Sequence, residues 1–204
     1  MAEQGTGPRT ALVLGGGGTR GAASLFRNDS LRSLLETHLP VRSFGELPIP
    51  LTIVATDLES GETVVLKDGK LIQAILASTA LPGLLPPISW QGCRLVDGGL
   101  SNNVPIDVAV ELGAERVFTM LCGCSKALPR RANLVTVLGQ SFSLALNARV
   151  RCDVCLYEPR AELHILEPCL APSLELLDFD RAWTLIEPAY RHALRELQRK
   201  LAPA

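Results

Sequence analysis

The 204-residue chain lacks a strong excess of either charge. Its 20 lysine and arginine residues nearly balance 21 aspartate and glutamate residues, and no basic stripe runs along the sequence. Surfaces that bind nucleic acid are usually marked by clustered basic residues. The sequence therefore predicts no nucleic-acid partner.

Internal repeats and low-complexity runs are also missing. At this length, one domain over residues 9–200 is expected, preceded by a disordered N-terminus at residues 1–8. The polar N-terminal segment does not have the apolar run of a signal peptide. We therefore expect a cytoplasmic protein.

Long apolar runs suited to crossing a membrane are absent as well. Residues 71–91 carry no charge, but Pro82, Pro86 and Pro87 interrupt any spanning helix there. The stretch predicts either a buried segment or a surface that touches lipid. A peripheral contact with a membrane surface is therefore left open.

The six cysteines allow a metal site only in principle. Cys122-x-Cys124 and Cys152-x-x-Cys155 have spacings that occur in zinc sites. However, the first pair lies in and just after an apolar run typical of a buried strand. Free thiols in a reducing compartment are the favoured interpretation, and we predict neither a metal ion nor a cofactor.

A glycine loop follows the first apolar strand of the chain. Residues 11–14 read Ala-Leu-Val-Leu, and residues 15–21 continue as Gly-Gly-Gly-Gly-Thr-Arg-Gly. Glycines allow backbone N–H groups to converge on an anion and allow a reacting atom to come close. The loop is therefore expected to be either a phosphate cradle or an oxyanion hole.

The phosphate alternative has weaker support. Gly16-x-Gly18-x-x-Gly21 after a strand fits the dinucleotide-binding fingerprint, which requires an acidic residue about twenty positions further on. Glu36 has that spacing, but it lies among leucines at helical spacing and is expected on a solvated helix face. There is also no Gly-Lys-Ser/Thr sequence for a P-loop.

The rest of the pattern predicts alternating strands and helices. Strands are expected at residues 50–57, 62–66, 93–96, 117–121 and 162–166, and helices at residues 30–39, 71–77, 105–112 and 132–150. The succession of strand, helix and strand from residue 93 to 121 predicts parallel pairing in an α/β sheet with helices on its faces.

The C-terminal segment predicts a further helix. Asp180 is expected to cap it, and Pro188 is expected to break or restart it. An apolar stripe follows and is expected to pack in the core; its members are Tyr190, Leu194, Leu197 and Leu201.

A second chemical motif is Asp97-Gly98-Gly99, which places a carboxylate at the C-terminal end of a predicted strand. Active-site groups of open α/β sheets collect at that edge. The alternative is an aspartate that caps its own turn, which is common when such a motif stands alone.

Four motifs occur in an order and spacing that resembles the patatin-like phospholipase family: GGGGTRG, TDLESGETVVL, ASTALPGLLPP and DGGLSNNVP. The resemblance runs from about Arg9 to Gly123. It implies a three-layer α/β/α sandwich around a central, mostly parallel sheet. It also implies hydrolysis of lipid ester bonds by a Ser-Asp dyad, with no histidine in the proton relay. The three histidines lie outside all four motifs: His38, His164 and His192.

The same resemblance assigns roles to residues of the two glycine-containing motifs. Asp97 matches the base of the dyad, within the motif Asp97-Gly98-Gly99. The implied oxyanion hole is the glycine loop, with Gly16, Gly17, Gly18, Arg20 and Gly21. Arg20 is expected either to steady that loop or to be an ordinary solvated arginine.

The nucleophile of the dyad has no counterpart in the sequence. No Gly-x-Ser-x-Gly elbow is present. The resemblance implies an internal strand and helix between Ser24 and Leu25, but these two residues are consecutive in the sequence. Ser24, Ser101 and Ser141 are candidate substitutes, although each lacks the strained turn that exposes such a serine. Loss of the strand predicts that the sheet closes up, that an edge pairs with another chain, or that the product is unstable.

Two functional hypotheses follow. The chain is either a lipid acyl hydrolase that depends on a substitute serine, or a shortened, non-catalytic relative that binds lipid.

Overall fold

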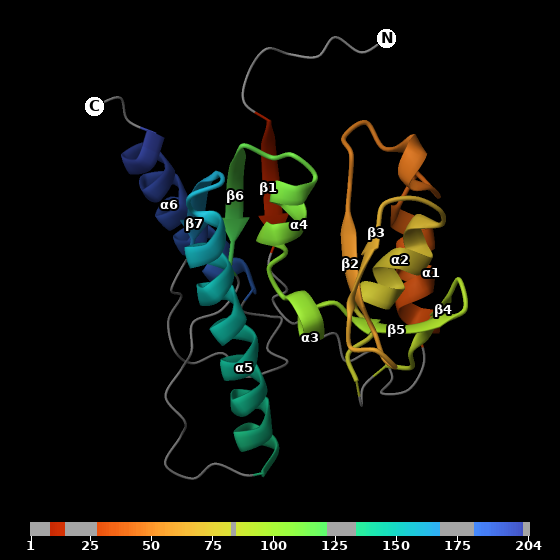
Figure 1. The fold of residues 1–204 in the computed structure, drawn as a ribbon. Helices are drawn as coiled ribbons and strands as arrows, with labels where there is room; N and C mark the ends of the chain where they lie inside the picture. The colour runs from red at the N-terminus through yellow and green to blue at the C-terminus, as the bar shows by residue number, and fades with distance from the viewer. Residues whose placement is uncertain (1–8, 15–27, 83–84, 122–133, 168–181, 202–204) are drawn as a thin grey trace. The chain divides into compact units, whose positions relative to one another are not determined.

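The computed structural model describes residues 9–14, 28–82, 85–121, 134–167 and 182–201 (Figure 1). The chain divides into two compact units, one of residues 1–18 with 104–204 and one of residues 19–103. We call them the parallel-sheet unit and the antiparallel-sheet unit. The predicted disordered residues 1–8 lie outside the described residues, and a single domain over 9–200 stays a prediction.

The parallel-sheet unit contains three strands in the order β1 (Thr10–Leu14), β6 (Arg116–Met120) and β7 (Glu162–Leu166). Both pairings are parallel, with Leu12 opposite Phe118 and Phe118 opposite His164. Among the described residues, β1 is paired only with β6, and Leu12 is 64% exposed. β1 is therefore an edge strand in the described part of this sheet.

Helices α4 (Ile106–Glu111) and α5 (Leu134–Tyr157) contribute side chains to the core of the same unit, together with β6 and the segments beside the helices. The buried side chains of this core are Val104, Ile106, Val117, Val150, Tyr157 and Ala161. α5 runs seven residues beyond the predicted end at residue 150, because Val150, Val154 and Tyr157 continue its packed face. Helix α6 (Ala182–Leu201) completes the unit, and Lys200 Nζ donates to the Ile165 carbonyl of β7 over 3.0 Å.

The antiparallel-sheet unit has the strand order β3 (Thr63–Leu66), β2 (Ile53–Asp57), β5 (Cys93–Asp97) and β4 (Ile88–Trp90). The predicted turns on either side of β3 contain Gly61 at φ +75° and Gly69 at φ +81°, the left-handed conformation that favours glycine. The hairpin of β2 and β3 is confirmed, with Thr56 opposite Thr63.

One expected pairing is wrong. β5 does not pair in parallel with β6 in the described residues; it pairs antiparallel with β2 on one side and β4 on the other. The hydrogen bonds of β5 come instead from β2, the first strand of the β2–β3 hairpin, and from the short strand β4. Sequence analysis missed β4. The α/β class is nevertheless confirmed, since the structure contains a parallel sheet and an antiparallel sheet with helices.

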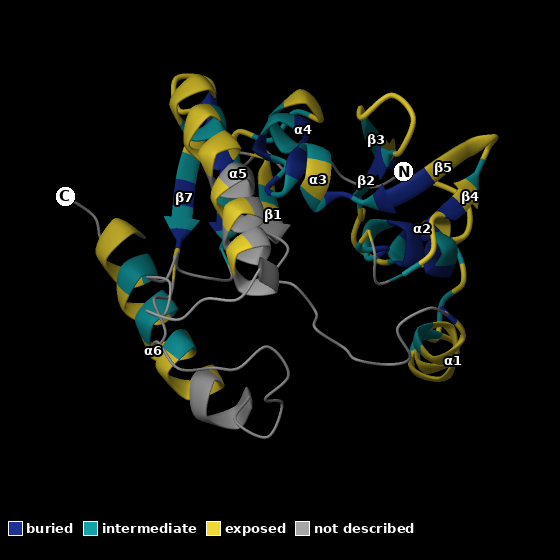
Figure 2. Cartoon of the chain, turned by 90° about the horizontal axis from the view of Figure 1, so that it is seen from below, coloured by how far each residue is buried: buried dark blue, intermediate teal, exposed yellow. Residues whose placement is uncertain are grey.

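Helix α2 (Leu71–Ser78) forms the centre of the second core. Its buried residues are Leu71, Ile72, Ala74, Leu76 and Ala77, and Figure 2 shows this helix mainly in the colour of buried residues. The first part of the uncharged stretch is thus a buried segment, as one of the two predictions for it stated. Phe44 of the 3₁₀ turn η1 (Phe44–Glu46) belongs to this core, and helix α1 (Asp29–His38) packs against it.

The C-terminal predictions need correction. Pro188 lies inside α6 and neither ends nor restarts it, since the helix is continuous from Ala182 to Leu201. Two members of the stripe predicted to pack in the core do not do so, because Tyr190 is 61% exposed and Leu194 is 40% exposed, whereas Leu197 is partly buried. Asp180 lies outside the described residues. Helical periodicity showed that α6 is amphipathic, but it did not show what the apolar side faces.

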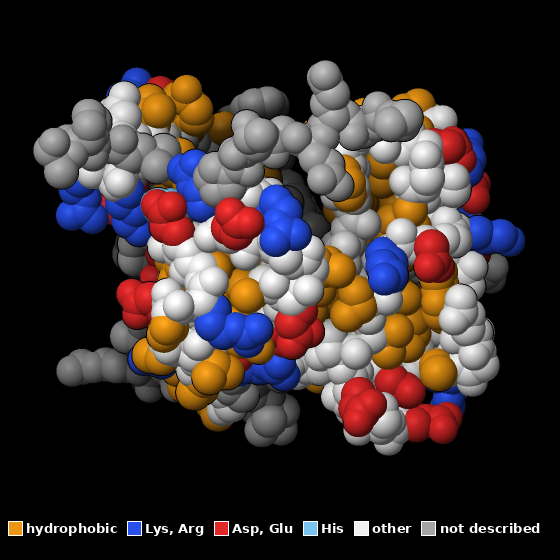
Figure 3. Space-filling view, turned by 45° about the horizontal axis from the view of Figure 1, so that its top comes forward, with side chains coloured by type: hydrophobic (Ala, Val, Ile, Leu, Met, Phe, Trp, Pro, Cys, Tyr) orange, Lys and Arg blue, Asp and Glu red, His pale blue; other side chains and the backbone are white. Residues whose placement is uncertain are grey.

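Surface charge follows the balanced composition. On the face drawn in Figure 3, basic and acidic side chains of the described residues are intermixed with hydrophobic ones. No helix within the described ranges has the length and apolar character needed to cross a membrane.

Candidate active site

Asp97 is held at three atoms at the end of β5. Its N–H donates to the Ala80 carbonyl over 3.0 Å, and its own carbonyl accepts the Thr56 hydroxyl over 2.8 Å. The N–H of Gly99 donates to Asp97 Oδ1 over 2.8 Å. The last contact is the local capping that the alternative interpretation of this motif predicted. Within the described residues it is the one hydrogen bond to the carboxylate. A carboxylate that caps its own turn through Oδ1 can therefore also accept a proton.

The surroundings of Asp97 favour a proton acceptor. Burial raises the pKa of the half-buried carboxyl, and the hydrogen bond from the Gly99 N–H opposes this only in part. A raised pKa makes the carboxylate a stronger base, which is what a group that deprotonates a hydroxyl requires. The partly buried environment of Asp97 therefore suits general-base chemistry.

The same burial predicts a stability effect. Because the folded-state pKa of Asp97 lies above the unfolded value of about 3.9, the folded state binds more protons between those two values, and stability falls as the pH rises through that interval. Asp97→Asn keeps an acceptor for the Gly99 N–H but carries no charge. We expect it to raise the free energy of unfolding at pH 7 by a small amount.

Urea unfolding of wild type and Asp97→Asn at pH 7 and at pH 3 measures this effect. The gain should be present at pH 7 and should disappear at pH 3, where the aspartate is protonated in both states. Asp68→Asn, at an exposed turn of the same unit, is the matched control. A loss of stability in Asp97→Asn at pH 7 would show that the charge is favourable in the folded state.

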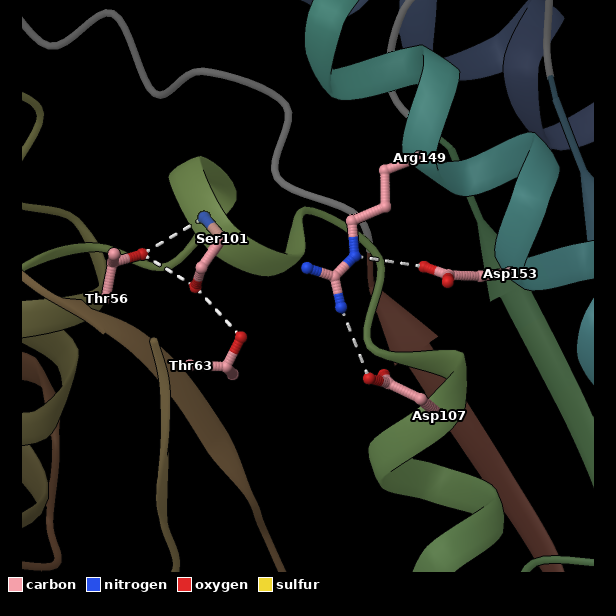
Figure 4. A network of polar contacts seen from close by, with 6 residues as sticks. All are labelled: Thr56, Thr63, Ser101, Asp107, Arg149 and Asp153. Carbon is pink, nitrogen blue, oxygen red and sulfur yellow. Dashed lines mark hydrogen bonds and ion pairs between the residues drawn. The ribbon is translucent and has the colours of Figure 1, made fainter. Parts of the chain in front are cut away.

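The hydroxyl groups of Thr56, Thr63 and Ser101 meet in a small network (Figure 4), which the Thr56 hydroxyl links to the Asp97 carbonyl. Thr56 Oγ1 lies 2.9 Å from Ser101 Oγ, and Thr63 Oγ1 donates to the same Ser101 oxygen over 2.9 Å. The Ser101 N–H also donates to Thr56 Oγ1 over 3.2 Å. These bonds fix α3 (Gly99–Asn102), and with it the Asp97 turn, to β2 and β3.

Ser101 is therefore a weak candidate for the nucleophile. Its hydroxyl is oriented by Thr56 and Thr63, and a threonine hydroxyl is not a general base. Sequence analysis missed both threonines. The sequence feature that could have identified them is their position on either side of the predicted Ser60-Gly61 turn, because the hairpin register places Thr56 opposite Thr63.

Thr56→Val tests how much the Thr56 hydroxyl contributes to stability. Valine has nearly the same shape, but it leaves the Asp97 carbonyl and the Ser101 N–H without this partner at a position that is 5% exposed. We expect unfolding free energy to fall by about 1–3 kcal/mol, and Thr56→Ser to recover most of the loss. Thr37→Val on exposed α1 is the control in denaturant titrations. Equal stability of the Thr56 and Thr37 variants would show that the network carries no net free energy.

Gly98 occupies a position with no room for a side chain. A Cβ added there would overlap the Val54 carbonyl oxygen of β2 and lie 2.8 Å from the carbonyl carbon. Gly98 has φ −63° and ψ −25°, which any residue can adopt. The requirement for glycine is thus close approach to a neighbouring strand and not an unusual backbone angle.

Several predicted site residues lie outside the described residues. They are Gly16, Gly17, Gly18, Arg20 and Gly21 of the implied oxyanion hole, together with the candidate nucleophile Ser24. Ser141 lies on α5 in the parallel-sheet unit and is exposed, whereas Asp97 belongs to the other unit. The structure thus brings together Asp97, Gly98, Gly99 and Ser101, and leaves the dyad's nucleophile unassigned.

A second polar cluster belongs to the parallel-sheet unit (Figure 4). Arg149 on α5 pairs with Asp107 of α4 over 3.5 Å and with Asp153 over 3.4 Å. Burial raises the pKa of Asp153, and the Arg149 guanidinium opposes this rise only in part. Because the cation bridges two helices, we assign the cluster to helix packing.

The cysteine alternative stays untested. Cys152 and Cys155 are exposed free thiols on α5, whereas Cys122 and Cys124 lie outside the described residues. The described residues contain no cluster of three or more histidine, cysteine, aspartate or glutamate side chains that could hold a metal ion.

Comparison with known proteins places these residues in a family context. Residues 22–110 match the family described as Patatin-like phospholipase. The chain is 30% identical over 146 residues to an uncharacterized NTE family protein of Mycobacterium tuberculosis, an alignment that covers 72% of this chain and 39% of the relative. It is 32% identical over 102 residues to human patatin-like phospholipase domain-containing protein 6, covering 49% of this chain and 7% of the relative. The chain thus spans less than half the length of these relatives.

Proposed function

This chain belongs to the patatin-like phospholipase family, and from that premise we propose that its site is built for acyl ester bonds of lipids, with Asp97 as the base. In this proposal the loop of Gly16, Gly17 and Gly18 holds the oxyanion. The carrying observation is the Asp97 turn, where burial raises the pKa of a carboxylate that Gly99 and Thr56 hold in place.

In the chemical step, the base removes a proton from a serine hydroxyl while that oxygen attacks the ester carbonyl carbon. The carbonyl oxygen then carries negative charge, which N–H groups of a glycine loop stabilise. Asp97 then returns the proton to the alcohol as the ester C–O bond breaks and the acyl group stays on the serine. A water molecule, deprotonated by the same carboxylate, attacks this acyl-serine, and the acid is released as the serine oxygen regains its proton. Each transfer requires a serine oxygen near the carboxylate, and no Gly-x-Ser-x-Gly elbow supplies one.

We therefore propose that hydrolysis is impaired in this chain, which would make it a pseudoenzyme unless another serine substitutes. A non-catalytic, lipid-binding role is the second candidate. It is favoured by the position of Ser101, whose hydroxyl is bound to two threonines. Both candidates require a lipid or ester ligand and no cofactor, and both fit a cytoplasmic protein that contacts membranes peripherally.

Fluorophosphonate labelling followed by peptide mapping separates the two. Such probes form a covalent bond with an activated serine, so we expect no adduct on Ser24, Ser101 or Ser141 in the purified full chain. Denatured protein gives the background, and Asp97→Asn is the matched variant. An adduct on one of these serines that is lost in Asp97→Asn would overturn the impaired state and establish a working dyad.

A further inference from the structure

Helix α6 presents a row of apolar side chains to solvent. Ile186 is 52% exposed, Tyr190 is 61% exposed and Leu194 is 40% exposed. A spacing of four residues places neighbours of this row on the same side of a helix. We call these three residues the α6 stripe. Figure 2 shows exposed residues along α6.

The stripe adjoins the surface by which α6 is half-buried, because Leu197 lies on the same side of the helix as Tyr190 and Leu194. Ala193 and Leu197 are only partly exposed, and Lys200 Nζ binds the Ile165 carbonyl of β7. The helix is therefore attached to its own unit, and the stripe is the part of its apolar side that this packing leaves exposed. Three large apolar side chains in one row are more than the scattered exposed leucines that any protein surface contains.

The charges of α6 indicate what the stripe contacts. The helix carries four basic residues against two acidic ones. Arg191, Arg195 and Arg199 follow each other at intervals of four in a second row, which borders the stripe where Arg191 precedes Leu194 by three residues. Arg191 pairs with Glu187 and Arg199 with Glu196, so these ion pairs stay within the helix. An apolar row with a basic polar face and modest overall hydrophobicity is typical of helices that lie in a membrane interface.

A protein partner fits the stripe less well. Stable protein interfaces bury about 800 Å² on each partner, and three partly exposed side chains in a single row provide far less than that. A lipid interface has no such minimum, because apolar side chains and basic residues each add to the binding. Tyrosine is also enriched at the level of lipid headgroups.

We propose that α6 is a lipid-surface helix, whose stripe enters the acyl boundary of an anionic phospholipid bilayer while its arginines face the headgroups. The inference rests on the proposed lipid-directed function for the choice of surface, and it requires no ester hydrolysis. Tyr190 and Leu194, which were predicted to pack in the core, would then attach the protein to a lipid surface.

Vesicle sedimentation of the full chain tests this directly. Wild type should bind vesicles of phosphatidylcholine with phosphatidylserine more strongly than vesicles of phosphatidylcholine alone, and more weakly as salt is added. The variant Tyr190→Ser with Leu194→Ser should reduce the partition coefficient about tenfold or more. Arg195→Gln should reduce it about threefold to fivefold, and only on vesicles that contain phosphatidylserine.

Leu34→Ser provides the matched control, because Leu34 is an exposed helical leucine (56%) on α1 of the other unit. It should bind vesicles as wild type does, and circular dichroism should show that all variants are folded. Absence of wild-type binding, or equal binding by the stripe variant, would overturn the inference. So would light scattering that shows a wild-type dimer dissociated by the stripe variant, since the stripe would then be a protein interface.

The two proposals fail in different ways. Vesicle binding without a serine adduct supports the α6 inference and leaves hydrolysis impaired. A serine adduct that depends on Asp97, together with vesicle binding that ignores the stripe, overturns the α6 inference and supports the ester-directed site.

Discussion

Gly98→Ala is expected to lower the free energy of unfolding of the antiparallel-sheet unit by about 2–3 kcal/mol or more. The added methyl group would overlap the backbone carbonyl of Val54 and lie 3.0 Å from Val54 Cγ2. Val54 is paired with Val65 in the centre of the hairpin, so it cannot move without disturbing that pairing. The cost is steric alone, because alanine readily adopts the backbone angles of Gly98.

The chain offers a close control in Gly45→Ala, where an added methyl group meets nothing within 4 Å. That variant should be neutral or slightly more stable, because alanine reduces the freedom of the unfolded chain. Guanidinium titration monitored by tryptophan fluorescence compares the two. Similar stabilities would show that β2 does not approach Gly98 as closely as the structure places it.

A consequence for the site follows from the same substitution. Gly98 is bonded to the Asp97 carbonyl carbon, so a shift of Gly98 moves the residue that donates to Asp97 Oδ1. A carboxyl carbon NMR titration should report a change in the pKa of Asp97 in Gly98→Ala and none in Gly45→Ala.

Local signals in the sequence predicted the hairpin and the position of Asp97. Gly61 and Gly69 mark turns because their backbone angles favour glycine, and the Asp97 motif follows an apolar run that forms a strand. These features depend on neighbours within a few residues. They could be predicted because local conformation and side-chain alternation decide them.

Pairing between distant segments could not be predicted in the same way. Thr56 and Ser101 are forty-five positions apart, and their contact depends on β5 lying antiparallel to β2. Several strands have similar apolar patterns, so composition does not select the neighbour. The exposure of Tyr190 is a related case, because a periodic pattern defines an apolar side but not whether protein covers it.

Leu95→Ala is expected to destabilise the chain by about 3–4 kcal/mol, because the substitution removes buried apolar surface and also leaves a cavity. The Leu95 side chain is fully buried and belongs to the core cluster around α2. It lies on β5 opposite Ile88 of β4 and Asp57 of β2, with strands on both sides that limit collapse of the cavity. Urea unfolding should show a lower midpoint with little change in slope.

Leu58→Ala is the control for this loss, because Leu58 is 45% exposed one residue beyond β2 and its truncation should cost well under 1 kcal/mol. Leu95 lies two residues before Asp97 but does not bond to it, so Leu95→Ala should leave the pKa of Asp97 close to the wild-type value under folding conditions. Gly98→Ala should change both quantities. If Leu95→Ala also shifts that pKa, the carboxylate is positioned by the packing of the whole strand and not by the Gly99 and Thr56 hydrogen bonds alone.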